Sequence, residues 1–315
     1  MAETLIVRLA KGEKIVILNV FLWGLIGCLM TILYGVYGNT EEVYVQGTSA
    51  IGWMVKYWLL PVVDMSHGWL IPVVSLFMVW GKRNELFATQ KYLSLGGFFI
   101  VFLALLLYLT GLRVQQTRFV LISLIVLLWG VPFFLYGKHV AGKLAFPCAY
   151  LVLCIPMNFL NSLTFPLRMI SSTVSVGLLN GFGISVTQMG TAIHVNAGAG
   201  FSLDVAYPCS GLRYLLAMVA LTTAYAYFTQ KSRLKIAILS ISAIPLAMIG
   251  NITRITLIAI VGVVFGDKFA LGFYHDYSGY VVFAVATLLM LGVGALLQRP
   301  WPVCQRNVPE GVNHV

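Results

Sequence analysis

Long apolar runs, separated by short polar segments, dominate the chain. Each run is close to the roughly 20 residues that a helix needs to cross a bilayer. The pattern predicts about eight membrane-spanning helices, at residues 15–37, 67–81, 92–112, 119–137, 144–162, 209–230, 236–261 and 277–298. The second run is short unless residues 59–66 extend it. We therefore expect an all-α integral membrane protein.

The predicted organisation is a single polytopic membrane domain at 15–298, between an N-terminal segment, 1–14, and a tail, 299–315. The tail is too short to fold alone, and no internal repeat is visible. No cleavable signal peptide is expected, because the first apolar run is long enough to span and has no small-residue cleavage site.

Two polar segments, 38–66 and 163–208, are longer than the others. The second begins with an amphipathic stretch, 165–183, and ends in alternating apolar and polar positions. Alternation on either side of a glycine-containing turn at 196–200 indicates a small β-hairpin just before Cys209. A simple loop is the alternative.

Composition agrees with the apolar pattern, because 60% of the residues are hydrophobic and only 10% are charged. About a quarter of the residues in a soluble domain are charged. The net charge of +10 does not indicate nucleic acid, since the basic residues lie in short loops between apolar runs.

The basic residues also predict the orientation in the membrane. With the N-terminus inside, 13 of the 20 Lys and Arg residues fall in inner segments and five in outer ones. Both termini are then cytoplasmic, and the hairpin lies on the outer face. Arg113 and Arg118, which fall outside, fit this placement least well.

The chain has five cysteines, and the predicted topology leaves Cys209 as the only one on the outer side. Cys28, Cys148 and Cys154 lie in apolar runs, and Cys304 lies in the tail. No pair has the spacing of a zinc site, so neither a metal nor another cofactor is expected. A lone outer thiol is either incidental or kept for chemistry.

Three reactive side chains converge on one layer of the predicted bundle. Cys209 opens the sixth run at the outer face, and His275 lies where the chain re-enters from outside. Arg254 lies about seven residues from the outer end of its run, roughly 10 Å below the surface. Charged residues inside a span indicate function by default.

These residue types suit acyl transfer through a thioester. The positive end of a helix favours the thiolate of Cys209, and Pro208 suits a helix start. His275 would exchange protons with the thiol and the leaving amine. Arg254 would stabilise the oxyanion with its fixed charge.

The neighbouring polar residues leave alternatives open. Arg254 either serves catalysis or pairs with Asp267 or Asp276, and Asn251 either orients that arginine or bonds another helix. Asp276 either orients the adjacent imidazole or points away from it. Arg213 either supports the site or anchors its helix by snorkelling.

The chain resembles the exosortase/archaeosortase family of membrane transpeptidases. The resemblance rests on five motifs in order: 66–72, 161–168, Pro-Cys-Ser-Gly-Leu-Arg at 208–213, Asn-Ile-Thr-Arg-Ile-Thr at 251–256 and His-Asp-Tyr-Ser-Gly at 275–279. The bacterial branch has histidine at the position of His275, where the archaeal branch has arginine.

The resemblance implies that Cys209 is the nucleophile, Arg254 the conserved arginine and His275 the catalytic histidine, with His67 in a supporting motif. It implies a cysteine-type transpeptidase of the bacterial inner membrane, with its site on the outer side. The substrate would be a secreted protein with a C-terminal sorting tail: a motif such as Pro-Glu-Pro, a hydrophobic helix and a basic end.

By the same likeness, the enzyme would pass the acyl group to an amine-bearing acceptor, with a link to exopolysaccharide or cell-surface assembly. Some relatives carry a further C-terminal domain, which is not expected in these 315 residues.

Three other functions compete with this one. A transporter would place polar groups near the midplane and show inverted repeats, and neither is visible. A lipid or sugar acyltransferase would share the thiol chemistry but not the peptide substrate. A structural scaffold does not account for reactive residues gathered in one layer.

Overall fold

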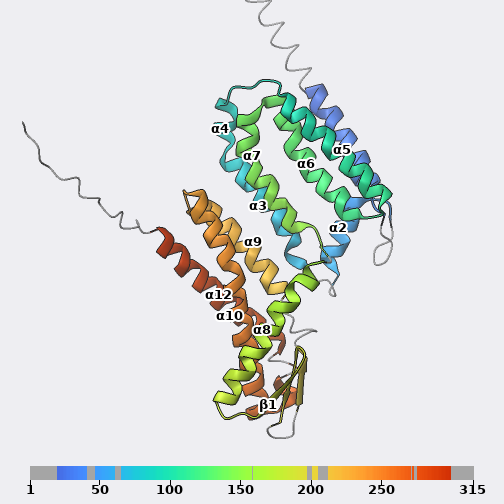
Figure 1. The fold of residues 1–315 in the computed structure, drawn as a ribbon. Helices are drawn as coiled ribbons and strands as arrows, with labels where there is room; N and C mark the ends of the chain where they lie inside the picture. The colour runs from blue at the N-terminus through green and yellow to red at the C-terminus, as the bar shows by residue number, and fades with distance from the viewer. Residues whose placement is uncertain are drawn as a thin grey trace, which may run out of the picture. The chain divides into compact units, whose positions relative to one another are not determined.

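The computed structural model describes residues 20–40, 47–60, 65–157, 159–196, 201–204, 212–270, 272 and 275–298. The chain forms two compact units, Met1–Leu160 and Asn161–Val315. Both consist mainly of helices, and the second also holds a small three-stranded sheet (Figure 1). The mostly helical architecture expected from the apolar runs is confirmed.

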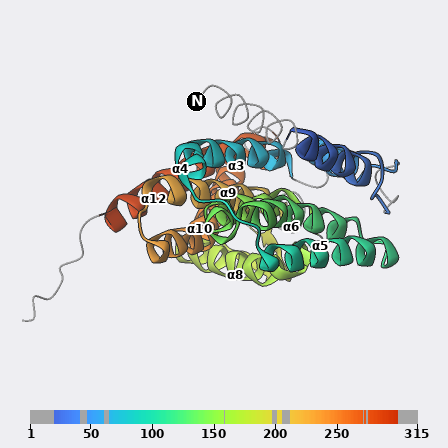
Figure 2. The same ribbon diagram turned by 90° about the horizontal axis from the view of Figure 1, so that it is seen from above.

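In the first unit, α5 (Leu95–Arg113) and α6 (Thr117–Tyr136) form an antiparallel pair (Figure 1 and Figure 2). A Cβ added at Gly97 would lie 2.2 Å from the backbone nitrogen of Phe134, so the two backbones approach closely there. Small residues permit such packing in lipid, where burial of apolar surface alone does not hold helices together.

The first described helix begins at Val20 and ends in a π-helical turn, Thr31–Val36. Tyr34 is fully buried, and its hydroxyl lies 2.8 Å from Ser123 Oγ on α6. Its ring contacts Tyr108 of α5 edge-on, at 5.2 Å between centroids. These contacts join the first apolar run to the α5–α6 pair.

Many large apolar side chains of α5 are exposed, as expected for a helix that faces lipid. They are Phe98, Phe99, Phe102, Leu103, Leu105, Leu106 and Leu109. This surface is consistent with a membrane protein.

The polar segment 38–66 contains a helix that the sequence pattern did not predict, α2 (Ala50–Leu59). Its N-cap is Ser49, whose hydroxyl accepts a hydrogen bond from Gly52 N at 2.8 Å. With ten residues, it is too short to stand out as a span. The predicted second run is helical, as a short 3-10 helix, Ser66–Trp69, followed by α3 (Leu70–Gly81).

The predicted fifth span, 144–162, is wrong as a continuous helix. The structure has α7 (Lys138–Tyr150), a 3-10 turn (Leu151–Cys154) and then α8 (Phe159–Gly181). A residue before proline avoids the helical conformation, and Ile155 before Pro156 is extended, with φ −82° and ψ 124°. The carbonyl of Pro156 accepts a hydrogen bond from Arg118 Nε at 2.7 Å.

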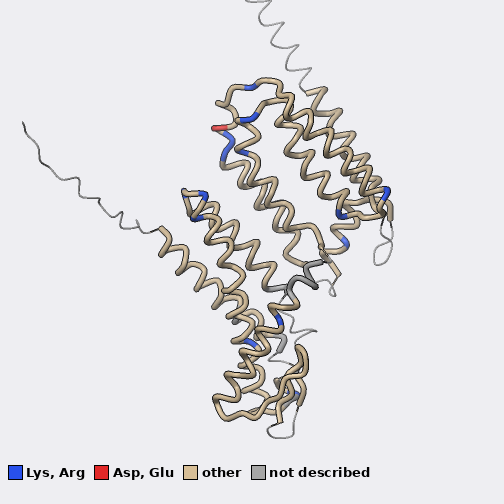
Figure 3. Tube along the Cα trace, viewed as in Figure 1, with Lys and Arg blue, Asp and Glu red and all other residues tan. Residues whose placement is uncertain are grey.

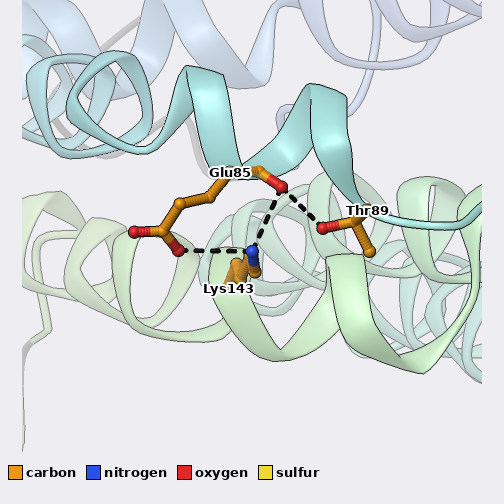
Figure 4. Close-up of polar contacts among 3 residues, drawn as sticks. All are labelled: Glu85, Thr89 and Lys143. Carbon is orange, nitrogen blue, oxygen red and sulfur yellow. Dashed lines mark hydrogen bonds and ion pairs between the residues drawn. The ribbon is translucent and has the colours of Figure 1, made fainter.

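A polar contact fastens α4 (Arg83–Ala88) to α7 (Figure 4). Lys143 Nζ lies 3.2 Å from a carboxylate oxygen of Glu85 and donates to the Glu85 carbonyl at 3.1 Å. The same carbonyl accepts a hydrogen bond from Thr89 Oγ1. Glu85 of α4 thus anchors the chain between α3 and α5 to α7.

The second unit begins with α8, which leads into an antiparallel sheet of order β1 (Val186–Met189), β2 (Ala192–Val195) and β3 (Phe201–Asp204). Strands β2 and β3 pair in the register Val195 with Phe201, so the predicted hairpin is confirmed. Strand β1 was not predicted; it adds a third strand on the far side of β2.

Three long helices complete this unit: α9 (Leu212–Thr229), α10 (Arg233–Phe265) and α12 (His275–Gln298), with the short α11 (Asp267–Phe269) before the last. They pack against one another. Gln230 Nε2 donates to Gly294 O at 3.1 Å, and Lys235 Nζ donates to Leu297 O. These contacts fasten the C-terminal end of α12 to the turn between α9 and α10.

Among the described residues, four helices are long and apolar enough to cross a membrane: α5, α6, α10 and the part of α12 from Tyr277. Shorter apolar helices cover Val20–Val36, Ser66–Gly81 and Leu215–Thr229. The predicted number of eight spans is thus not confirmed. Lys and Arg lie mostly near helix ends (Figure 3), as the loop pattern of the sequence indicates.

Candidate functional site

Arg254 is a buried cation in the middle of an apolar helix. It lies on α10, and only 4% of its surface is exposed. Its Nε donates a hydrogen bond to Ser278 Oγ on α12, at 3.2 Å. Ser278 is itself 3% exposed. A charge in such surroundings requires polar partners, and Ser278 is one of them.

This hydrogen bond brings Arg254 to the start of the last helix. Helix α12 begins at His275, and Ser278 follows three residues later, less than one helical turn on. The structure therefore places the arginine next to the turn that carries the predicted catalytic histidine. The side chains of His275 and Asp276 lie outside the described part of the chain.

Two hydrophobic clusters flank Arg254 along α10. On one side, Leu246 packs with Met218 of α9 and with Ala286 and Met290 of α12. On the other, Ile255, Ile258 and Ala259 pack with α8 and the sheet, in a cluster that includes Leu179, Val186, Ile193, Val195 and Ala270. Arg254 thus lies between two parts of α10: one packs against α9 and α12, and the other packs against α8 and the sheet.

Helix α10 ends later than the sequence predicted. The apolar run was expected to end at 261, but the helix continues to Phe265, which lies about 16 Å beyond Arg254 along the axis. The extra turn packs against β3: a Cβ at Gly262 would lie 2.3 Å from the ring of Phe201. The contact fixes strand β3 against α10.

Helix α8 is also held to this part of α10. Ser175 is fully buried and donates to Ile252 O at 3.4 Å, while Ser172 donates to Thr191 O beside the sheet at 3.0 Å. The amphipathic stretch predicted at 165–183 thus lies in helix α8, which contacts both the sheet and the part of α10 near Arg254.

Two polar groups near Arg254 have no hydrogen-bond partner among the residues that the structure describes. They are Asn251 Oδ1 and Thr256 Oγ1, both buried atoms on α10. Asn251 therefore does not accept a hydrogen bond from Arg254, which was one of its two expected roles. Thr253, between them, is exposed and bonds Ile249 O of its own helix.

Cys209 lies outside the described residues, between the end of β3 at Asp204 and the described start of α9 at Leu212. Arg213 is the second residue of α9, and Asp267 begins α11; their side chains also lie outside the described part. The predicted ion pairs of Arg254 with Asp267 or Asp276 therefore stay predictions.

His67 belongs to the first unit, in the 3-10 helix before α3. The glycine that follows it has a packing role, because a Cβ at Gly68 would lie 2.4 Å from Trp58 Nε1. The Trp58 indole in turn donates to Cys154 O at 2.8 Å. This stretch of the 66–72 motif therefore positions α2 against α3 and the 3-10 turn that follows α7.

Within the described residues, no group of three His, Cys, Asp or Glu side chains could hold a metal ion. Cys28, Cys148 and Cys154 are free thiols. Sequence reasoning did not assign a role to Ser278, the partner of Arg254. Its place in the 275–279 motif, three residues after His275, was the available signal.

Comparison with known proteins gives the family. No curated protein and no solved structure matches the chain. The sequence model of the transmembrane exosortases (Exosortase_EpsH) matches residues 61–292, which include Cys209, Arg254, Ser278 and most of both units. With nearly three quarters of its length matched, the chain belongs to the transmembrane exosortase family.

Proposed function

We propose that this protein is a membrane-embedded cysteine transpeptidase that cleaves the C-terminal sorting tails of secreted proteins. Membership of the exosortase family supports a membrane sorting transpeptidase in general. The observation that carries the proposal further is the buried Arg254, bonded to Ser278 beside the helix start that holds His275.

The reaction would proceed through a thioester on Cys209. The thiolate attacks the scissile carbonyl carbon, and the oxyanion that forms faces the guanidinium of Arg254. When the C–N bond breaks, His275 gives a proton to the leaving amine. An amine of the acceptor then attacks the thioester, His275 takes up its proton, and the thiolate of Cys209 is restored.

Chain connectivity supports this assignment of roles. Cys209 is three residues before Leu212, and three residues span about 10 Å at most. Helix α9 packs against α10 and α12, which carry Arg254 and His275. The nucleophile is therefore tethered to the same three-helix bundle as the other two residues.

The substrate chemistry follows from the membrane setting. A sorting tail with a hydrophobic helix would cross the bilayer beside the bundle, with its basic end on the cytoplasmic side. Its scissile bond would lie at the outer interface of the bacterial inner membrane, and both termini of this protein would be cytoplasmic. The acceptor would be an amine at the cell surface.

The test is processing of a tailed reporter by the Cys209→Ala variant. The reporter carries a Pro-Glu-Pro motif, a hydrophobic helix and a basic end, and the product is measured by its mass. Wild-type protein should shorten the reporter, and Cys209→Ala should leave it intact while still accumulating in the membrane. Processing by the variant at the wild-type rate would refute the proposal.

A further inference from the structure

Asn251 presents a hydrogen-bond acceptor beside Arg254 that nothing in the described structure uses. Its Oδ1 is buried and has no partner among the described residues. Buried polar atoms in native proteins nearly always have partners, and each exception requires an explanation. A ligand that supplies the donor is one such explanation, and it can be tested against the surrounding geometry.

The geometry places a donor and an acceptor side by side. Asn251 and Arg254 are three residues apart on α10, so they share a face with their Cβ atoms about 5–6 Å apart. Arginine has only donors, and an asparagine Oδ1 only accepts. Ser278 fixes Arg254 from α12, and Ser175 fixes the intervening residue Ile252 from α8.

One residue of an extended peptide has the complementary pair of groups. In a strand, the N–H and C=O of the same residue point to the same edge, where they engage one acceptor and one donor. A carbonyl that binds Arg254 would therefore bring the N–H of its own residue toward Asn251. Neither group alone would define the direction of the peptide, but the two together do.

We propose that Asn251 Oδ1 accepts the backbone N–H of the substrate residue whose carbonyl carbon is attacked. This inference rests on the proposed function, since it takes Arg254 as the group that binds that carbonyl. It specifies the substrate class: an extended peptide whose residue on the N-terminal side of the scissile bond is not proline, because proline has no N–H.

The experiment compares Asn251→Leu with Thr253→Ala in purified protein. Leucine keeps the branched outline of asparagine, with a larger volume, but removes the acceptor. Thr253 is exposed and bonds its own helix. Asn251→Leu should slow cleavage of the tailed reporter about tenfold, the effect of one lost hydrogen bond. Its melting temperature should stay unchanged or rise, because the unpaired buried acceptor is gone. Thr253→Ala should cleave at the wild-type rate.

A modified peptide tests the wild-type protein directly. Once the cleaved bond is mapped by mass spectrometry, a synthetic peptide is made with an N-methyl group on the residue before that bond. N-methylation should slow cleavage by the wild-type protein about tenfold. It should not slow cleavage by Asn251→Leu any further, since N-methylation and the substitution remove the same hydrogen bond.

Equal slowing of both proteins by N-methylation would overturn the inference, as would wild-type cleavage by Asn251→Leu. If Cys209→Ala is inactive in the same assay, either of these results refutes only the role of Asn251 and leaves the proposed function standing. If Cys209→Ala is active, the proposed function itself fails.

Discussion

Arg254 Nε and Ser278 Oγ lie 3.2 Å apart and join the middle of α10 to the first turn of α12. Both side chains are almost fully buried, so this contact sets the orientation of the guanidinium. It links the buried cation to the helix that begins with His275.

Replacing Ser278 by alanine removes the acceptor of Arg254 Nε. The initial rate of reporter cleavage should fall about tenfold, the effect of losing a hydrogen bond to a charged group. Ser278→Thr keeps a hydroxyl and should retain more activity than Ser278→Ala. If the alanine variant matches the wild type at saturating substrate, the contact has no part in positioning Arg254.

Arg254→Lys keeps the charge but loses the planar group that spans two partners at once. Cleavage should fall about 100-fold, as on removal of an oxyanion donor. Arg233→Lys, at the exposed start of the same helix, is the matched control and should have no effect. Near-normal turnover by Arg254→Lys would argue against binding of the oxyanion by a fixed guanidinium.

Gly262→Ala should destabilise the second unit, because the new Cβ would lie 2.3 Å from the ring of Phe201. Overpacking of this kind costs about 1–3 kcal/mol in the free energy of unfolding. Gly177→Ala on α8, with no atom within 4 Å of the new Cβ, should be neutral or slightly stabilising.

The measurement for Gly262 is thermal unfolding of the purified variants in detergent. Phe201→Leu in the Gly262→Ala background should recover part of the loss, because the shorter side chain makes room for the methyl group. If Gly262→Ala unfolds at the wild-type temperature, strand β3 does not pack on α10 as the structure shows.

The proposed orientation predicts which thiols face outward. In spheroplasts, a membrane-impermeant maleimide should label a variant that keeps only Cys209. A variant that keeps only Cys304 should be labelled only after the membrane is opened. The reverse pattern would show that the basic loops were assigned to the wrong side.

The sequence predicts much of this fold because each apolar run has the length of a span, and the helices from Leu95 to Tyr136 follow those runs closely. The hairpin of β2 and β3 was visible in its alternation and central turn. The break after Cys154 was missed, since the apolar pattern continues across Pro156 while the backbone does not. Strand β1 was missed although it pairs with the next strand across a two-residue turn, because its four residues, Val186–Met189, give too short an alternation to stand out.

For the candidate site, the sequence indicated Arg254 by its charge within an apolar run, and the structure finds that residue buried. The sequence did not reveal that Ser278 binds it, because a contact across 24 residues depends on how α10 and α12 pack. The unused acceptor of Asn251 likewise became visible only when its neighbours were in place.

The most direct test of the central claim is capture of the acyl-enzyme. Purified protein is mixed with the tailed reporter, quenched in acid and digested, and the peptide that contains Cys209 is analysed by mass spectrometry. The account predicts a thioester on Cys209. Its acyl group is the reporter peptide that ends at the cleaved bond, on the N-terminal side of that bond. A lipid acyl group on that thiol, or an unmodified Cys209 during active turnover with the acyl group elsewhere, would contradict it.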